Sequence, residues 1–204
     1  MIEAVVWDIG HVLAYWEPEA FYDRLIGEPL RTQLFDQVPL HDMNVEVDRG
    51  ADLLGAVSAL AKTHPDWSDE ILAWHDNWPQ TFQRPVEGSA ETLRALKANG
   101  VRCVSLTNFG AQAMVWAKDI HPVLREFDQE FVSAELGLIK PDPAIYEAVE
   151  KGTGLRGPQL IFTDDKKENI AAAAARGWNT HLFDGASGWR DRLTAEGLLA
   201  DSPA

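Results

Sequence analysis

Reactive polar side chains stand at or near the ends of four apolar runs in this chain. The runs are followed by Asp8, by Thr107 and Asn108, by Lys140, and by the adjacent pair Asp164 and Asp165. A carboxylate can attack an electrophile and form an ester or an acyl phosphate. A hydroxyl can hold substrate oxygens, and an ammonium group can neutralise a negatively charged group. The set points to nucleophilic chemistry on a small anionic substrate.

The apolar runs predict the elements that must position these groups. Runs rich in Val, Ile and Phe are typical of buried parallel strands, which we expect before Asp8 and at residues 101–106, 130–133, 160–163 and 180–183. Helical patterns alternate with them, which predicts right-handed crossovers. The carboxyl ends of such strands meet at one sheet edge, where open α/β sheets bind ligands.

Residues 18–78 show only helical patterns. Apolar stripes at helical spacing run from Phe21 to Ile26 and from Leu53 to Ala61, and a third helix is expected over 67–78, with Ser68 or Asp69 available as its cap. We therefore predict an α/β fold, with a Rossmann-like parallel sheet flanked by helices and a small all-helical cap inserted after the first strand. The predicted core comprises residues 1–15 and 80–204, with 201–204 fraying, and the cap comprises residues 16–79.

The chain order of the polar groups resembles the haloacid dehalogenase-like hydrolase superfamily over nearly the whole chain. The first motif, Asp8-Ile-Gly10-His11-Val12, is similar to that of small phosphatase-like members with a helical cap, which open with Asp-x-Gly-Asn-Val. Each motif is short, so the resemblance depends on all four occurring in the family's order.

The resemblance implies a role for each group. Asp8 would be the nucleophile, Lys140 and Thr107 would act in catalysis, and both would bind the substrate's phosphate together with Asn108. Lys140 precedes Pro-Asp-Pro, which predicts a rigid turn before a helix that Asp142 caps.

A metal site is implied at the same edge. The resemblance assigns Mg²⁺ to Asp8, the Gly10 carbonyl and Asp165, with Asp164 ligating or orienting the ion. Three converging carboxylates repel each other unless one is protonated or a cation binds, and Mg²⁺ takes oxygen ligands including one or two carboxylates. The acidic pair also suits the N-terminus of the following helix, and both interpretations can hold together.

The first motif departs from the family's pattern at Gly10. Phosphatases of the superfamily usually carry a second aspartate there, which protonates the leaving group, and losing such an acid typically costs about 10²- to 10⁴-fold in rate. Asp-x-Gly members share the gap. His11 is a candidate replacement because histidine is a residue type suited to proton transfer near neutral pH, although it is offset by one residue.

The cap is expected to select the substrate by closing over the sheet edge. Arg49 lies in a segment, Asn44 to Gly50, that resembles a cap segment of the family, and an arginine there could bind phosphate or carboxylate in a bidentate manner. An ion pair with Asp48 on the surface is the alternative for Arg49. Simpler structural roles exist for the other residues too: loop capping for Asp8, a surface position for Lys140, turn chemistry for Thr107, and packing for His11.

Composition limits the partners. The chain has 204 residues, 18 basic and 32 acidic side chains, and a formal net charge of −14, which argues against nucleic acid and anionic membrane surfaces. The single cysteine, Cys103, lies in an apolar run and is expected to be buried. Absence of a signal-like segment predicts a cytoplasmic protein. For its assembly we expect a monomer or a homodimer.

These features predict a magnesium-dependent hydrolase of small phosphate monoesters. One alternative is a metal-independent 2-haloacid dehalogenase that uses the same Asp8, which needs no acid for a halide leaving group but has little use for the Asp164–Asp165 pair. The other is a weakly active or binding-only member of the fold, which the gap at Gly10 would allow.

Overall fold

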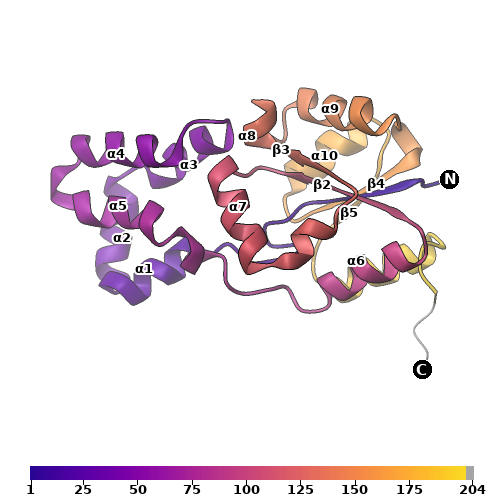
Figure 1. The fold of residues 1–204 in the computed structure, drawn as a ribbon, viewed down its shortest axis with the longest axis horizontal. Helices are drawn as coiled ribbons and strands as arrows, with labels where there is room; N and C mark the ends of the chain where they lie inside the picture. Colours follow the sequence, from indigo (N-terminus) through magenta and orange to yellow (C-terminus); the bar gives the residue numbers. More distant parts are fainter. Residues whose placement is uncertain (201–204) are drawn as a thin grey trace.

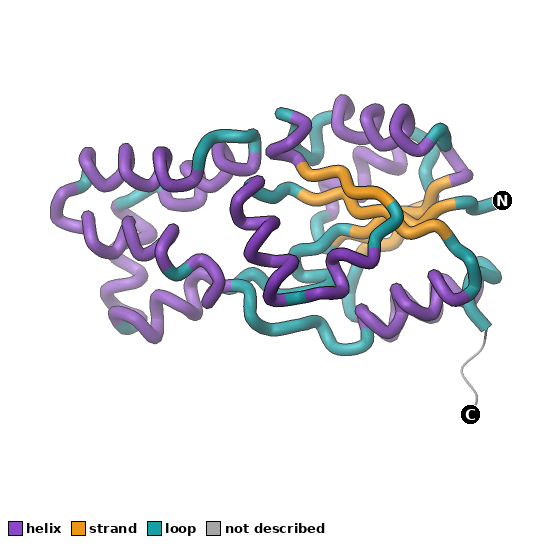
Figure 2. The backbone as a smooth tube through the Cα atoms, viewed as in Figure 1, coloured by secondary structure: helices purple, strands orange, loops and turns teal. Residues whose placement is uncertain are grey.

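The structure, a computed structural model, describes residues 1–200. Residues 201–204, for which fraying is predicted, lie outside the described residues. A parallel sheet occupies one end of the molecule and a group of helices the other, as Figure 1 shows. Strands and loops alternate with helices around the sheet, whereas the other end contains helices and loops (Figure 2).

The sheet has five parallel strands in the order β3-β2-β1-β4-β5. They are β1 (Ala4–Trp7), β2 (Arg102–Thr107), β3 (Gln129–Val132), β4 (Leu160–Asp164) and β5 (Asn179–Leu182). The central strand β1 pairs with both β2 and β4, and Trp7 lies opposite Ser105 and Thr163. The residues that follow these three strands therefore meet at one edge. The predicted Rossmann-like α/β fold is confirmed.

Alternate side chains of the sheet face two hydrophobic clusters. Val5 and Trp7 of β1 contribute to one cluster, and Ala4 and Val6 contribute to the other. The first cluster includes residues of α6 (Ser89–Ala98), α7 (Ala111–Ile120) and α11 (Ala186–Ala195). The second includes residues of α9 (Pro143–Thr153) and α10 (Lys167–Ala175). The central strand is thus buried on both faces, as expected for a parallel sheet.

Short elements complete the sheet-bearing part. They are the helix α8 (Ser133–Leu136) and the 3-10 turns η3 (Pro122–Glu126) and η4 (Gly157–Gln159). The predicted cap at Asp142 is present, because its side chain accepts a hydrogen bond from the Ala144 N–H at the start of α9 at 3.0 Å. At the end of α6, Gly100 has a positive φ of 76°, which suits a helix C-terminus. Cys103 is buried, as predicted.

The segment between β1 and α6 is helical, as predicted, with more helices than the apolar stripes indicated. Its elements are α1 (Pro18–Ile26), α2 (Glu28–Gln37), α3 (Leu40–Asp48), α4 (Leu53–Thr63) and α5 (Ser68–Asp76), with the 3-10 turns η1 (Pro65–Trp67) and η2 (Trp78–Thr81). Its buried side chains, such as Tyr22 and Trp74, belong to the same hydrophobic cluster as Trp7 of the sheet. The segment therefore packs onto the sheet-bearing part through a continuous core.

The predicted cap of the third helix is wrong. Ser68 and Asp69 lie inside α5, whose N-cap position is Trp67, without a side-chain cap hydrogen bond. The reason is that η1 runs directly into α5, so Ser68 already has helical φ and ψ angles of −57° and −45°, whereas an N-cap residue has non-helical ones. Within residues 1–200, none of the helices combines the length and the apolar character that crossing a bilayer requires.

Candidate active site

The strand ends open into a cavity of about 590 Å³ between the sheet edge and the helical segment. Side chains from both sides line it. The sheet edge and its following loops contribute Asp8, Gly10, His11, Thr107, Asn108, Lys140, Asp165, Lys166 and Asn169. The helical segment and its contacts contribute Trp16, Glu19, His41, Asn44, Val45, Val47, Asp48, Leu53, Trp78, Phe109, Gly110 and Ala113. All the predicted site residues except Asp164 and Arg49 thus line one cavity.

Lys140 lies at the centre of the charged groups. Its Nζ is 2.7 Å from Asp8 Oδ1 and 2.7 Å from Asp164 Oδ2, and it donates to the Leu106 carbonyl at 2.9 Å. Its side chain is only 1% exposed. Burial lowers the pKa of Lys140, but the two carboxylates outweigh burial and raise it, so the side chain is a cation that faces Asp8.

Asn108 holds Lys140 in place. The Asn108 Nδ2 donates to the Lys140 carbonyl at 3.0 Å, and the Lys140 N–H donates to Asn108 Oδ1 at 2.8 Å. This reciprocal pair joins the loop after β2 to the loop before α9. Asn108 therefore uses both ends of its amide to position the lysine backbone, while the buried Thr107 beside it lines the cavity.

Asp164 is fully engaged by neighbouring donors. Its Oδ1 accepts from the Lys166 N–H at 2.8 Å and from Asn169 Nδ2 at 3.0 Å, and its Oδ2 accepts from Lys140 at 2.7 Å and from Asn169 at 3.0 Å. A carboxylate offers about four lone-pair sites, so these bonds occupy them all. Asn169 thus supports the loop after β4 from within α10.

The surroundings of Asp8 and Asp165 disfavour the ionised forms of both carboxyl groups. Burial raises the pKa of Asp8 to about 7, where Lys140 lowers it and Asp164 and Asp165 raise it further. Burial and then Asp164 also raise the pKa of Asp165. Each raised pKa means that ionising the group costs free energy in this site. The site is short of positive charge.

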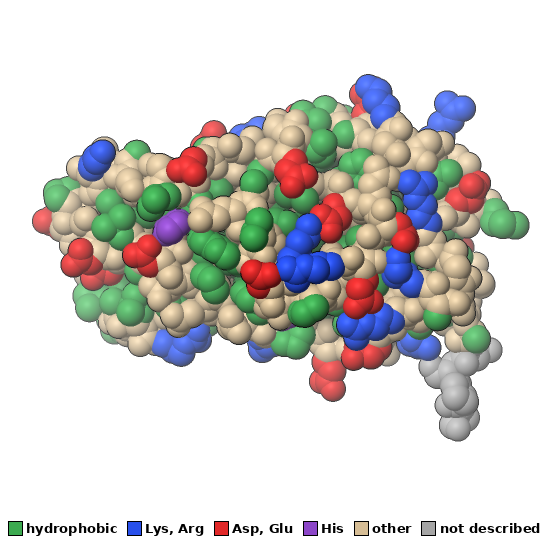
Figure 3. Space-filling view, in the orientation of Figure 1, with side chains coloured by type: hydrophobic (Ala, Val, Ile, Leu, Met, Phe, Trp, Pro, Cys, Tyr) green, Lys and Arg blue, Asp and Glu red, His purple; other side chains and the backbone are tan. Residues whose placement is uncertain are grey.

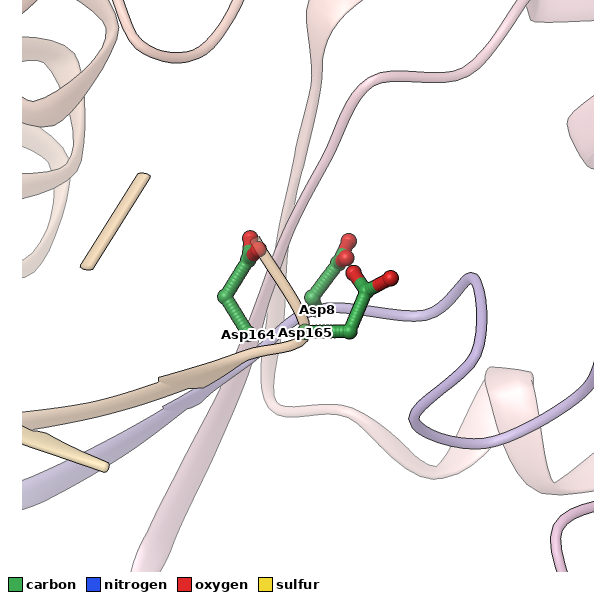
Figure 4. A group of neighbouring side chains, drawn as sticks. All are labelled: Asp8, Asp164 and Asp165. Atoms are coloured by element: carbon green, nitrogen blue, oxygen red, sulfur yellow. The ribbon is translucent and has the colours of Figure 1, made fainter. Parts of the chain in front are cut away.

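The three carboxylates fit a divalent cation. One oxygen from each of Asp8, Asp164 and Asp165 lies within 4.8 Å of the others. Figure 4 shows the carboxyl groups projecting in the same direction from two neighbouring strand ends. All the available ligand atoms are oxygens, and the negative charge of three carboxylates exceeds the single positive charge of Lys140. Both properties suit Mg²⁺. Since Asp164 is saturated by hydrogen bonds, Asp8 and Asp165 have the freer oxygens.

The first motif turns sharply after Asp8. His11 has a left-handed φ of 58°, which is unusual for a residue with a side chain, and its N–H donates to the Ala14 carbonyl at 2.8 Å. The His11 ring lines the cavity and lies 5.9 Å from the ring of Tyr15. A Cβ at Gly10 would meet nothing within 4 Å, so crowding does not explain the missing aspartate.

Arg49 is not brought to the cavity. Its side chain is 48% exposed and lies 3.7 Å from Glu46, one turn earlier on α3. The preceding residue, Asp48, lines the cavity instead. The predicted contact of Arg49 with substrate has no counterpart in this arrangement and stays a prediction.

Sequence reasoning missed three charged residues of the cavity, Glu19, Asp48 and Lys166. Burial raises the pKa of Asp48 to about 7, although Lys166, the Gly110 amide, Asn44 and Lys140 all lower it. Lys166 directly follows the acidic pair, and that adjacency was the available signal. Asp48 had no such signal, because its neighbours in space come from distant parts of the chain.

Comparison with known proteins identifies relatives of the whole chain. A family model described as haloacid dehalogenase-like hydrolase matches residues 2–177. A sesquiterpene phosphatase of Aspergillus oryzae is 31% identical over 188 residues, which cover 89% of this chain and 90% of that protein.

Solved structures share the fold. A haloacid dehalogenase family enzyme of Bacteroides thetaiotaomicron, in complex with magnesium and inorganic phosphate, has a TM-score of 0.71 and 20% identity, covering 91% of this chain and 96% of that one. The L-2-haloacid dehalogenase of Xanthobacter autotrophicus with covalently bound chloropropionic acid has a TM-score of 0.65 and 20% identity, covering 98% and 85%. At this identity the likeness concerns the fold.

Proposed function

Because the chain belongs to the haloacid dehalogenase-like hydrolase family, we propose that it is a magnesium-dependent phosphatase that hydrolyses small phosphate monoesters through a phosphoaspartyl intermediate on Asp8. The observation that carries the proposal is the cluster of Asp8, Asp164 and Asp165 around one point, with Lys140 as its nearest cation. The phosphatase relative at 31% identity supports the same activity over dehalogenation.

The metal-binding groups would be Asp8, the Gly10 carbonyl and Asp165. Asp164 would orient the site through its bonds to Lys140 and Asn169 rather than supply a free oxygen. When bound, Mg²⁺ would neutralise negative charge on the phosphoryl oxygens and polarise them.

In the proposed phosphoryl transfer to Asp8, Lys140 and Thr107 would assist the nucleophile. Asp8 lies at the end of the central strand, with its backbone N–H bonded to the Thr163 carbonyl at 3.0 Å, so the nucleophile is held by the sheet. Lys140, 2.7 Å from Asp8, favours the ionised form of the carboxylate against burial and would attract the phosphoryl group. The Thr107 hydroxyl would donate a hydrogen bond to a phosphoryl oxygen. The Asp8 oxygen then forms a bond to phosphorus as the ester P–O bond breaks.

The helical segment would act as the substrate-selecting cap. It supplies much of the cavity wall, through residues such as Trp16, Val45 and Leu53. We propose residues 16–79 as the cap and residues 1–15 with 80–204 as the core. The fit to a small anionic substrate, the cytoplasmic location and the monomeric or homodimeric state stay predictions.

The test is phosphate release from a panel of small phosphomonoesters, measured with Mg²⁺ and with a chelator. We expect release that requires Mg²⁺ and falls at least about 10³-fold in Asp8→Asn, because the nucleophile is lost. The exposed Asp119→Asn, whose carboxylate pairs with Arg125 on the surface, is the matched control and should retain full activity.

Two outcomes would overturn the proposal. Release of chloride from 2-chloropropionate, without phosphate release from any ester, would establish a dehalogenase. Binding of a phosphate analogue without turnover of any substrate would establish a binding-only protein. Mg²⁺ should also raise the melting temperature of the wild type and not that of Asp165→Asn, which tests the metal site without reference to activity.

A further inference from the structure

A phosphatase that works through Asp8 needs an acid for the departing alcohol, and position 10 carries no side chain. The remaining carboxyls that line the cavity are Glu19, Asp48 and Asp165. Asp165 belongs to the metal cluster, and Glu19 accepts a hydrogen bond from His41 at 3.0 Å with both side chains about half exposed. Asp48 is therefore the one of these three carboxyls that neither belongs to the metal cluster nor pairs with a histidine.

Asp48 is held in place by close contacts of the residues on either side of it. It ends helix α3, and the residue before it, Val47, lies so near Gly110 that a Cβ at Gly110 would be 2.7 Å from Val47 Cγ1. Just beyond it, Gly50 has a positive φ of 114°, and a Cβ there would lie 3.0 Å from the Ala134 carbonyl oxygen. The first contact joins the end of α3 to the loop that follows β2, and the second joins it to α8, which follows β3. Asp48 is therefore fixed in the wall of the cavity that Thr107 and Asn108 also line, although it comes from the helical segment.

The groups around Asp48 are suited to proton transfer. On its own helix Asn44 donates to Asp48 Oδ2 at 3.2 Å, and the Gly110 amide faces it from the start of α7. Lys166 approaches from the loop after β4, and Lys140 from the loop before α9. Burial outweighs these groups and raises the pKa of Asp48 to about 7, so both protonation states are populated near neutral pH.

We propose that Asp48 protonates the leaving-group oxygen and later deprotonates the attacking water, replacing the aspartate that is absent at position 10. This role rests on the phosphatase function proposed above. In the first step the Asp8 oxygen bonds to phosphorus, the ester P–O bond breaks, and its electron pair takes the Asp48 proton to give the alcohol. In the second step Asp48 takes a proton from water as the water oxygen bonds to phosphorus. The Asp8–phosphorus bond breaks, which regenerates the Asp8 carboxylate and releases phosphate.

The experiment compares a poor with a good leaving group. Loss of a general acid slows an alkyl phosphate by about 10²- to 10⁴-fold, whereas p-nitrophenolate leaves without a proton. We expect Asp48→Asn, which keeps the size of the side chain, to lower kcat/KM for n-propyl phosphate by at least about 10²-fold and for p-nitrophenyl phosphate by less than about tenfold. Because kcat/KM covers only steps up to alcohol release, slow hydrolysis of the intermediate does not enter it.

A second readout uses the other half of the proposed role. Asp48→Asn should give a burst of p-nitrophenol, about one per enzyme, because the phosphoaspartyl intermediate accumulates without a base for water. Asp48→Glu, which keeps a carboxyl, should restore part of the rate on n-propyl phosphate. Asp42→Asn, an exposed carboxylate in the first turn of the same helix, is the matched control and should leave both substrates unchanged.

Three outcomes separate the possibilities. Equal losses on both esters in Asp48→Asn would overturn the acid role and indicate a structural one. A loss selective for n-propyl phosphate in His11→Ala, with Asp48→Asn unaffected, would assign the acid to His11 instead. Failure of the wild type to release phosphate from either ester would overturn the proposed function itself, and the Asp48 role with it.

Discussion

The two sides of the cavity are built in opposite ways. We call the strand-end side chains the floor and the cavity-lining side chains of the helical segment the roof. The floor consists of Asp8, Thr107, Lys140, Asp164 and Asp165, and the roof of Trp16, Glu19, His41, Asn44, Val45, Val47, Asp48 and Leu53. In the floor, buried charges pair with one another, as in the contacts of Lys140 with Asp8 and Asp164. In the roof, apolar side chains lie among polar ones, of which Glu19 and His41 are exposed and Asn44 and Asp48 are half-buried.

This difference suggests that the floor residues carry out the chemistry and that the roof residues set the substrate selectivity. The floor groups constrain each other, because removing one leaves a buried charge without its partner. A roof side chain such as Val45, which is 40% exposed, can change with little effect on packing. On the drawn outer face of the molecule, acidic and basic side chains are interspersed over the sheet-bearing part, whereas hydrophobic side chains with some acidic ones between them lie over the helical part (Figure 3).

The largest expected effect is on stability, at Lys140. Lys140→Met leaves Asp8 and Asp164 without their cation, so the free energy of unfolding should fall by about 3–5 kcal/mol. Urea denaturation in the presence of a chelator measures it. The roof counterpart is Glu19→Gln, which breaks the exposed pair with His41 and should cost less than about 1 kcal/mol. Similar losses in the two variants would contradict the distinction between floor and roof.

Asp48 belongs to the roof, but like the floor carboxyl Asp8 it has a pKa that burial raises to about 7. Its raised pKa means that the folded state binds more protons than the unfolded state between about pH 4 and 7, so stability falls as pH rises through that window. Asp48→Asn should remove this part of the fall, at most about 1.4 kcal/mol per pH unit. Urea denaturation of both proteins from pH 4 to 8 in chelator tests it, since Asp8 contributes equally to both. If the free energy of unfolding depends on pH in the same way in both proteins, the pKa of Asp48 is not raised by folding.

A smaller effect is expected on selectivity, at Val45. Val45→Asn replaces an apolar wall with a polar one of similar size, so kcat/KM for esters of apolar alcohols should fall about tenfold relative to glycerol phosphate. Val115→Asn is the control, since Val115 is 60% exposed on α7 and does not line the cavity. An equal loss on both esters in Val45→Asn would mean that the roof affects catalysis rather than selectivity.

The smallest effect is expected at Arg49. Its guanidinium is exposed and paired with Glu46, so Arg49→Ala should raise KM by less than about tenfold and leave kcat unchanged. Steady-state kinetics on the best ester of the panel measures both constants. A rise in KM beyond a hundredfold would show that Arg49 turns into the cavity and binds substrate, as the sequence predicted.

The floor residues could be predicted because each is marked by residues next to it in the sequence. Asp8, Thr107 and Asp164 stand at the ends of apolar strands, and parallel pairing around β1 brings such ends together. The capping signal at Asp142 is equally local, and it was predicted. Where a local signal competed with a neighbouring element, as at Ser68 after η1, the prediction was wrong.

The sequence by itself determined the fold class, the family and the set of reactive groups, because these follow from strand patterns and short motifs. The tertiary structure alone decided how those groups are used. Asn108 binds the backbone of Lys140 across 32 residues, and the Val47–Gly110 contact fixes Asp48 in the wall of the cavity. Such contacts depend on distances between elements remote in sequence, which no local spacing of residues encodes.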